Sequence, residues 1–155
     1  QYHEKSLEAY MAKHGENHSL VATACLNIGT VANAMRDYQK ACDNFVRSLD
    51  IYLKVCGPNH PSTAVPYSHL GELFNDLGQT EKGLEYFAVA LGINKKVYGD
   101  NHPTVVKIAA RMAHLQHLVL QEKKKNGEGN GGEDAKKKEE KVEEEKEEVS
   151  GTSKE

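Results

Sequence analysis

Apolar residues recur along the chain at steps of three and four positions, the spacing that places side chains on one face of an α-helix. One series predicts a helix over about residues 22–32, and a second predicts a helix over about 38–52. The two series are Ala22, Cys25, Ile28, Gly29 and Ala32, then Tyr38, Ala41, Phe45, Ser48, Leu49 and Tyr52. The pattern therefore predicts a pair of amphipathic helices, each with an apolar face to bury.

One short string, Gly-x-Asn-His, occurs three times and ends at His18, His60 and His102, which stand 42 positions apart. Pro follows the second and third copies. Apolar and small positions keep the same step: Ile28, Leu70 and Met112; Gly29, Gly71 and Ala113; Phe45 and Phe87; Leu7, Leu49 and Leu91. A two-helix unit of 42 residues is therefore repeated, and such units stack because one helix pair cannot bury its apolar face alone.

The string carries the residues that end one helix and begin the next. Its Gly suits a left-handed C-terminal cap, and Asn-His-Pro supplies a capping side chain followed by a residue with helix-ready φ. Gly29 and Gly71 lower helix propensity inside the first helix of each full unit. We predict that a neighbouring helix packs closely against the bare backbone at these two glycines.

From residue 2 to about residue 120, this pattern resembles the tetratricopeptide repeat family, in the 42-residue form of kinesin light chain and nephrocystin-like proteins. The packing positions of that family are matched by Cys25, Ile28, Gly29, Ala32, Ala41, Phe45 and Ser48, and by Tyr67, Leu70, Gly71, Phe74, Gly83, Phe87 and Ala90. The trailing signature of kinesin light chain repeats is echoed at 56–61 and 98–103. The resemblance implies an all-α fold, a right-handed α-α superhelix.

Two full repeats, at about 18–59 and 60–101, are flanked by half repeats. Residues from about 1 to 17 are expected to hold the second helix of a unit whose first helix is missing, and residues 102–122 a terminal capping helix. We expect this repeat domain, residues 1–122, to be about three-quarters helical. Since the chain begins with Gln1 rather than Met, we also expect it to be part of a longer protein.

Residues 123–155 form a charged, low-complexity tail rich in Gly, Lys and Glu, with Val142 and Val149 as its sizeable apolar residues. Such a segment buries too little surface to offset the entropy of ordering, which predicts disorder. Glu/Lys pairs over residues 136–148 favour a single helix as the alternative.

The net charge is −3, from 20 basic and 23 acidic residues that are mostly interspersed. No basic face suits nucleic acid, so nucleic acid is not an expected partner. No apolar run is long enough to cross a membrane, and no secretion signal opens the chain. Cys25, Cys42 and Cys56 form no paired framework, which indicates reduced thiols and a soluble, cytoplasmic protein.

Motifs for catalysis and metal binding are absent from the sequence. It has no Gly-rich phosphate loop, no HExxH and no GxSxG, so we expect no enzyme activity and no cofactor. The repeat histidines lie one repeat apart, of order 10 Å for stacked helices, which is too far to share one zinc ion. Surface histidines are the preferred interpretation, and no metal site is expected.

In the family that the sequence resembles, the first helix of each unit lines a concave groove that binds a peptide. Carried over by register, the groove residues are Thr23, Asn27, Thr30, Asn33, Ser68, His69, Glu72, Asn75, Lys107, Arg111 and His114. Lys107 and Arg111 stand four apart on one helix face, a spacing suited to gripping an acidic segment. The alternative is that these two charges only keep the terminal helix soluble.

The leading hypothesis is a non-catalytic scaffold that binds a partner peptide in this groove, as an adaptor similar to kinesin light chain. One alternative is a structural or oligomerisation segment of a larger signalling protein. Another is a regulatory repeat region of an enzyme whose catalytic domain lies elsewhere. The partner's identity and the oligomeric state stay open.

Overall fold

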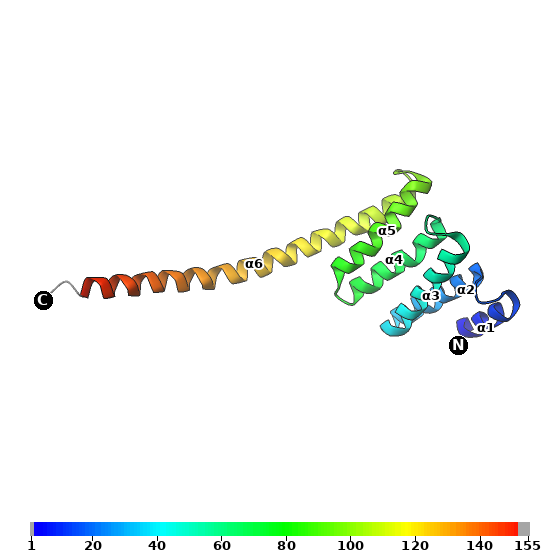
Figure 1. The fold of residues 1–155 in the computed structure, drawn as a ribbon, viewed down its shortest axis with the longest axis horizontal. Helices are drawn as coiled ribbons and strands as arrows, with labels where there is room; N and C mark the ends of the chain where they lie inside the picture. Colours follow the sequence, from blue (N-terminus) through cyan, green and yellow to red (C-terminus); the bar gives the residue numbers. More distant parts are fainter. Residues whose placement is uncertain (1, 152–155) are drawn as a thin grey trace. The chain divides into compact units, whose positions relative to one another are not determined.

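The computed structural model describes the backbone of residues 2–151, with the side chains of residues 3–13 and 15–127 (Figure 1). This part of the chain consists of α-helices without a strand. They are α1 (Tyr2–His14), α2 (Ser19–Ala34), α3 (Tyr38–Cys56), α4 (Pro61–Asp76), α5 (Thr80–Tyr98) and α6 (Pro103–Gly151). The chain divides into two compact units, residues 1–116 and 117–155, and the helix pairs lie in the first.

Within residues 1–116, successive helices pack on one another. Helices α2 and α3 form one pair, α4 and α5 form the next, and α3 packs on α4 between the pairs. Helix α1 packs on α2 as the second helix of a half repeat. The predicted all-α superhelix of two full repeats flanked by half repeats is therefore confirmed.

The helices that open each unit begin at the histidines of the repeated string. Nδ1 of His18, His60 and His102 accepts a hydrogen bond from the backbone N–H two residues later, at 3.1, 3.1 and 3.2 Å. Each ring thus satisfies one of the donors that a helix leaves unpaired at its N-terminus. The capping side chain expected within Asn-His-Pro is the histidine.

The glycines of the string end α3 and α5 in a conformation that differs from the predicted left-handed cap. Gly57 and Gly99 have the expected positive φ, 83° and 78°, but their ψ values are 172° and 170°. This region of φ and ψ is essentially restricted to glycine, whereas the left-handed helical region is also open to Asn. The chain extends at once because the next capping histidine follows only three residues later.

The close approach predicted at Gly29 and Gly71 is confirmed, and an aromatic ring makes it in each repeat. A Cβ atom placed on Gly29 would lie 2.5 Å from the ring of Phe45, and one on Gly71 would lie 2.8 Å from the ring of Phe87. The core around Phe45 takes side chains from α2, α3 and α4, and the core around Phe87 takes them from α4, α5 and α6. Each repeat therefore completes its core with the first helix of the next.

Ser48 is a polar residue in this core, and its replacement by alanine is expected to stabilise the protein. The side chain is 0% exposed, and its hydroxyl has no hydrogen-bond partner. Alanine fits, because Ala90 holds the equivalent position 42 residues later. Ser48→Ala should raise the free energy of unfolding, measured by urea denaturation, by about 1 kcal/mol. The reverse change, Ala90→Ser, should lower it, and a loss of stability in Ser48→Ala would contradict the interpretation.

Helix α6 continues from the expected capping helix into the charged segment that composition predicts to be disordered. Its backbone is helical as far as Gly151, so structure and composition differ over residues 123–151. Glu/Lys pairs at helical spacing over residues 136–148 favour the helix, while the glycines within residues 127–132 oppose it. Disorder of residues 123–155 in solution stays a prediction, and residues 152–155 lie outside the described part.

Candidate functional site

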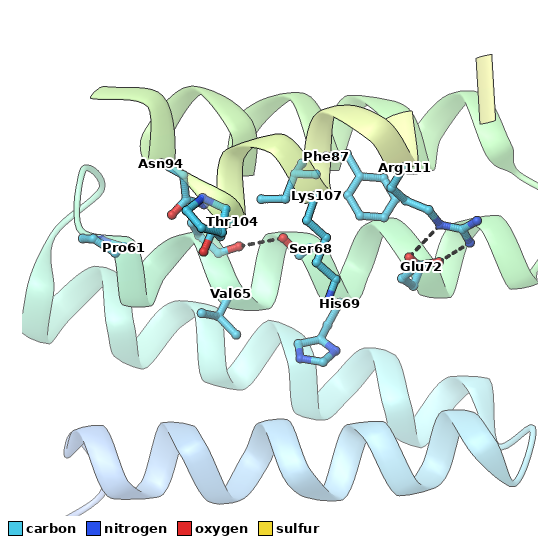
Figure 2. A pocket seen from close by; sticks show the side chains of 13 residues that line it. Pro61, Val65, Ser68, His69, Glu72, Phe87, Asn94, Thr104, Lys107 and Arg111 are labelled. Atoms are coloured by element: carbon cyan, nitrogen blue, oxygen red, sulfur yellow. Dashed lines mark hydrogen bonds and ion pairs between the residues drawn. The ribbon is translucent and has the colours of Figure 1, made fainter. Parts of the chain in front are cut away.

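A groove lies between α4 and α6, with α5 contributing to its floor (Figure 2). Its volume is about 700 Å³, within the range of sites that hold small ligands. Apolar side chains from all three helices form its walls, among them Ala64 and Val65 of α4, Phe87 of α5 and Ile108 of α6. The groove lies entirely within the first compact unit.

Five of the groove residues predicted from the sequence line this cavity together. They are Ser68, His69, Glu72, Lys107 and Arg111. Because they stand on α4 and α6, the first helices of successive units, the register argument placed them on facing surfaces. The structure thus brings predicted groove residues of α4 and α6 to one site.

The predicted residues on α2 lie outside this cavity. The hydroxyls of Thr23 and Thr30 donate to the backbone carbonyls four residues earlier, at 3.0 and 2.8 Å. Asn27 is exposed, as is His114 of α6. These side chains remain candidates for a longer binding surface but are not assembled into a pocket.

Asn33 and Asn75, which are 42 residues apart, form contacts between helices of the repeat domain. Nδ2 of Asn33 donates to Oδ2 of Asp76 at 2.8 Å, which links α2 to α4. Oδ1 of Asn75 accepts from the hydroxyl of Thr80 at 3.3 Å. Both amides thus have a structural role that the sequence did not predict.

Arg111 is joined to Glu72 by a two-pronged ion pair between α6 and α4. Nε of Arg111 donates to Oε1 of Glu72 at 2.9 Å, and a terminal nitrogen donates to Oε2 at 2.6 Å. These hydrogen bonds raise the pKa of Arg111 above its usual value, so the side chain stays charged. The expected grip of Arg111 on an acidic partner therefore competes with an internal carboxylate. Lys107, the other cation that lines the groove, pairs with no carboxylate of the described residues.

His69 connects the groove to the core of the preceding repeat. Its ring stacks on Phe45 with 5.1 Å between the ring centroids. Burial lowers the pKa of His69 below its usual value of 6.5, while the negative charge of Glu72 acts in the opposite direction. The ring is therefore neutral at pH 7.

This lowered pKa predicts how His69 makes stability depend on pH. As pH falls through 6.5, the unfolded chain takes up a proton at this position before the folded chain does, so the free energy of unfolding decreases. His69→Gln removes this contribution. Urea denaturation between pH 7 and about 5 should therefore show a smaller loss of stability in His69→Gln than in the wild type, and equal losses would contradict the prediction.

Asn94 is a groove residue that the sequence reasoning missed. It is 4% exposed, and its Nδ2 donates to the backbone oxygen of Ala90 at 2.9 Å. The family resemblance places groove residues on the first helix of each unit, whereas Asn94 stands on α5. The signal was present in the register, because Asn94 occupies the place of Tyr52 one repeat later.

The repeat histidines cap helices, and Cys25 packs in the core. No group of three or more His, Cys, Asp or Glu side chains that could hold a metal ion occurs in the described part of the chain. Cys25 and Cys42 are free, and burial raises the pKa of both thiols, which keeps them protonated. Cys25 is fully buried in the first core, where the sequence placed it on an apolar repeat position.

Residues 20–96 match the family model described as tetratricopeptide repeat. The match begins in α2 and ends in α5, so it covers both full repeats. No curated protein matches the chain. Repeats of this family generally mediate protein–protein interactions, and proteins built from them are typically non-catalytic scaffolds. None of the helices in the described residues is long and apolar enough to cross a membrane.

Proposed function

We propose that this tetratricopeptide-repeat chain is a non-catalytic scaffold that binds a short acidic segment of a partner protein in the groove between α4 and α6. The observation that carries the proposal is the position of Lys107. It lines an apolar groove, its side chain is exposed, and no acidic side chain of the described residues pairs with it. An ammonium group at the edge of an apolar cleft favours a peptide that brings a carboxylate.

The ion pair beside Lys107 gives the groove a second recognition element. Arg111 uses two of its five N–H donors on Glu72 and keeps the others. Because Glu72 holds the guanidinium in place, those donors are pre-organised for the carbonyl or carboxylate oxygens of a peptide. Lys107 then supplies the charge that selects an acidic segment, and Arg111 supplies directional hydrogen bonds.

Within this proposal the chain acts as an adaptor similar to kinesin light chain. The unbroken 42-residue period and the Gly-x-Asn-His string support this closer assignment. A cytoplasmic location belongs to the same proposal, since the three cysteines are free thiols.

Selection of peptides from a random phage-displayed library on the full chain tests the proposal. We expect the selected peptides to be enriched in Asp and Glu. Loss of one charge-assisted bond should cost about tenfold or more in affinity, so Lys107→Glu should weaken the best peptide by that factor in fluorescence anisotropy. Lys96→Glu, at an exposed site on α5, is the matched control and should bind as the wild type does.

Two outcomes would overturn the proposal. One is a set of selected peptides whose affinity is equal in Lys107→Glu and in the wild type. The other is the absence of any selected peptide together with concentration-dependent self-association in light scattering, which favours a structural or oligomerisation role.

A further inference from the structure

The outer face of α6 is apolar, although repeat arrays normally end in a polar surface that keeps them soluble. Val106 is 54% exposed, whereas Ala22 and Ala64, its equivalents in the two full repeats, are 0% and 1% exposed. Ala113, the equivalent of the two ring-covered glycines, is exposed as well. Helices α3 and α5 cover the corresponding faces of α2 and α4, and no described helix follows α6. This face of α6 therefore lacks a second helix among the described residues.

The other end of the stack has the complementary gap, because α1 is a second helix and no described helix precedes it. Tyr10 of α1 is 38% exposed, whereas the equivalent Tyr52 packs against α2 and is 7% exposed. Val31 of α2 is 45% exposed, whereas the equivalent Leu73 and Leu115 are 0% and 1% exposed. Those two leucines lie in cores that a complete preceding helix pair helps to form. Helices α1 and α2 thus leave open a face that a first helix covers in the later repeats.

The two open faces match at the position where a ring meets a helix. In both full repeats a phenylalanine ring of the second helix lies on a glycine of the first, and a Cβ atom there would lie 2.5 or 2.8 Å from the ring. On α6 this glycine is replaced by Ala113, and on α1 the phenylalanine is replaced by His3. The five-membered ring of histidine is smaller, so it leaves room for the methyl group of alanine. Ala113 and His3 can make this contact only between two copies, since the two full repeats separate α1 from α6.

We propose that copies of this chain associate head to tail, with α1 of one copy packing on α6 of the next as the second helix of its incomplete repeat. The two helices then form a pair equivalent to α2 with α3 and to α4 with α5, so the solenoid continues across the junction. Such an interface is heterologous, because it joins two different faces of the molecule. It therefore builds open chains or rings of copies rather than a twofold dimer.

The junction and the peptide groove use different sides of α6. Steps of three and four place Val106, Ala109 and Ala113 on one side of the helix. Lys107 and Arg111 line the groove and extend toward α4 (Figure 2). Head-to-tail association thus goes beyond the proposed peptide binding, and either can fail without the other.

Sedimentation velocity of the full chain over a range of concentrations measures the association, and the weight-average mass should rise with concentration. Ala113→Glu and Tyr10→Glu each bury an unpaired carboxylate in the junction, which should weaken association about tenfold or more. Both positions are exposed in a single copy, so both variants should keep the helical circular dichroism of the wild type. Val46→Glu adds the same charge at an exposed position of α3, outside both faces, and should associate as the wild type does.

Mixing the two junction variants tests the head-to-tail arrangement itself. Ala113→Glu keeps an intact α1 face and Tyr10→Glu keeps an intact α6 face, so the mixture should form a one-to-one dimer and no larger species. A twofold interface through either face would stay blocked in the mixture. The inference would be overturned by a wild-type chain that is monomeric at every concentration. A mixture that stays monomeric while the wild type associates would also overturn it.

Discussion

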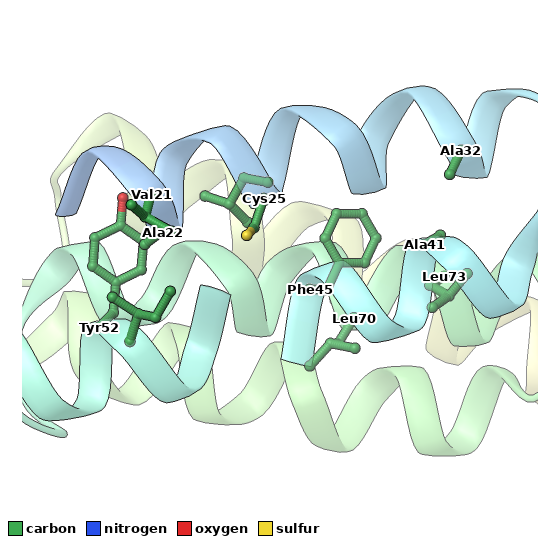
Figure 3. Close-up of a cluster of buried hydrophobic side chains, with 11 residues drawn as sticks. Val21, Ala22, Cys25, Ala32, Ala41, Phe45, Tyr52, Leu70 and Leu73 are labelled. Atoms are coloured by element: carbon green, nitrogen blue, oxygen red, sulfur yellow. The ribbon is translucent and has the colours of Figure 1, made fainter. Parts of the chain in front are cut away.

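Replacing Phe45 with alanine is expected to lower the free energy of unfolding by about 3–5 kcal/mol, the range for a buried phenylalanine. The Phe45 ring lies in the buried cluster of Figure 3. It is 1% exposed, covers the backbone of Gly29, and stacks on His69. Its removal opens a cavity where α2, α3 and α4 meet, so both repeats lose packing. Small domains have about 5–15 kcal/mol of stability in total, and this loss is a large share. Urea denaturation followed by circular dichroism measures it.

Val46→Ala is the matched control for this prediction. Val46 follows Phe45 on the same helix, but half of its side chain is exposed. We expect a loss below about 1 kcal/mol, as for most surface substitutions. Similar losses in the two variants would show that the Phe45 ring does not join the repeats as described.

Gly83→Ala is expected to destabilise the second helix pair by about 1–3 kcal/mol, the usual cost of overpacking. A Cβ atom on Gly83 would lie 2.7 Å from the backbone oxygen of Gly71 and 3.3 Å from the backbone nitrogen of Asn75. Backbone atoms cannot rotate away as side chains do, so α5 has to move away from α4. The same denaturation experiment measures the effect.

Gly92 lies on the same helix, α5, and its replacement by alanine is expected to raise the free energy of unfolding, whereas Gly83→Ala lowers it. No atom lies within 4 Å of a Cβ placed on Gly92. Alanine should therefore raise stability by up to about 1 kcal/mol through helix propensity alone. A gain of stability in Gly83→Ala as well as in Gly92→Ala would contradict the close packing of α4 against α5.

The first repeat shows how far apart α4 and α5 would have to lie to accommodate a side chain at position 83. Ala41 occupies the equivalent position there and is fully buried. The first helix pair thus accommodates a methyl group that the second pair excludes. A neutral Gly83→Ala would mean that α4 and α5 can adopt the spacing of α2 and α3 without cost.

The repeat architecture was predictable because apolar spacing and a fixed period both act along the sequence. Steps of three and four predicted helix pairs, and the Gly-x-Asn-His string predicted where each unit begins. The extended ψ at Gly57 was not predictable, because a positive φ in glycine is compatible with more than one cap. That choice depends on where the next helix starts in space.

The groove was predictable in part. The family resemblance, carried over by the repeat register, placed Ser68, His69 and Lys107 on facing helices, and they line one cavity. The pairing of Arg111 with Glu72 was not predictable, because it depends on the side-chain geometry of residues 39 positions apart. Asn94 was not predicted because the family resemblance places groove residues on the first helix of each unit, whereas Asn94 stands on α5.

The most direct test of the central claim is an NMR map of methyl and amide groups of the full chain, with and without the tightest selected peptide. The account predicts that the shifted methyl groups lie around the α4 and α6 groove, at Ala64, Val65 and Ile108, with the Asn94 amide shifted as well. Val46 on α3 and Val89 on α5, both exposed, should stay unchanged. Shifts confined to those two residues, with the groove unaffected, would contradict it.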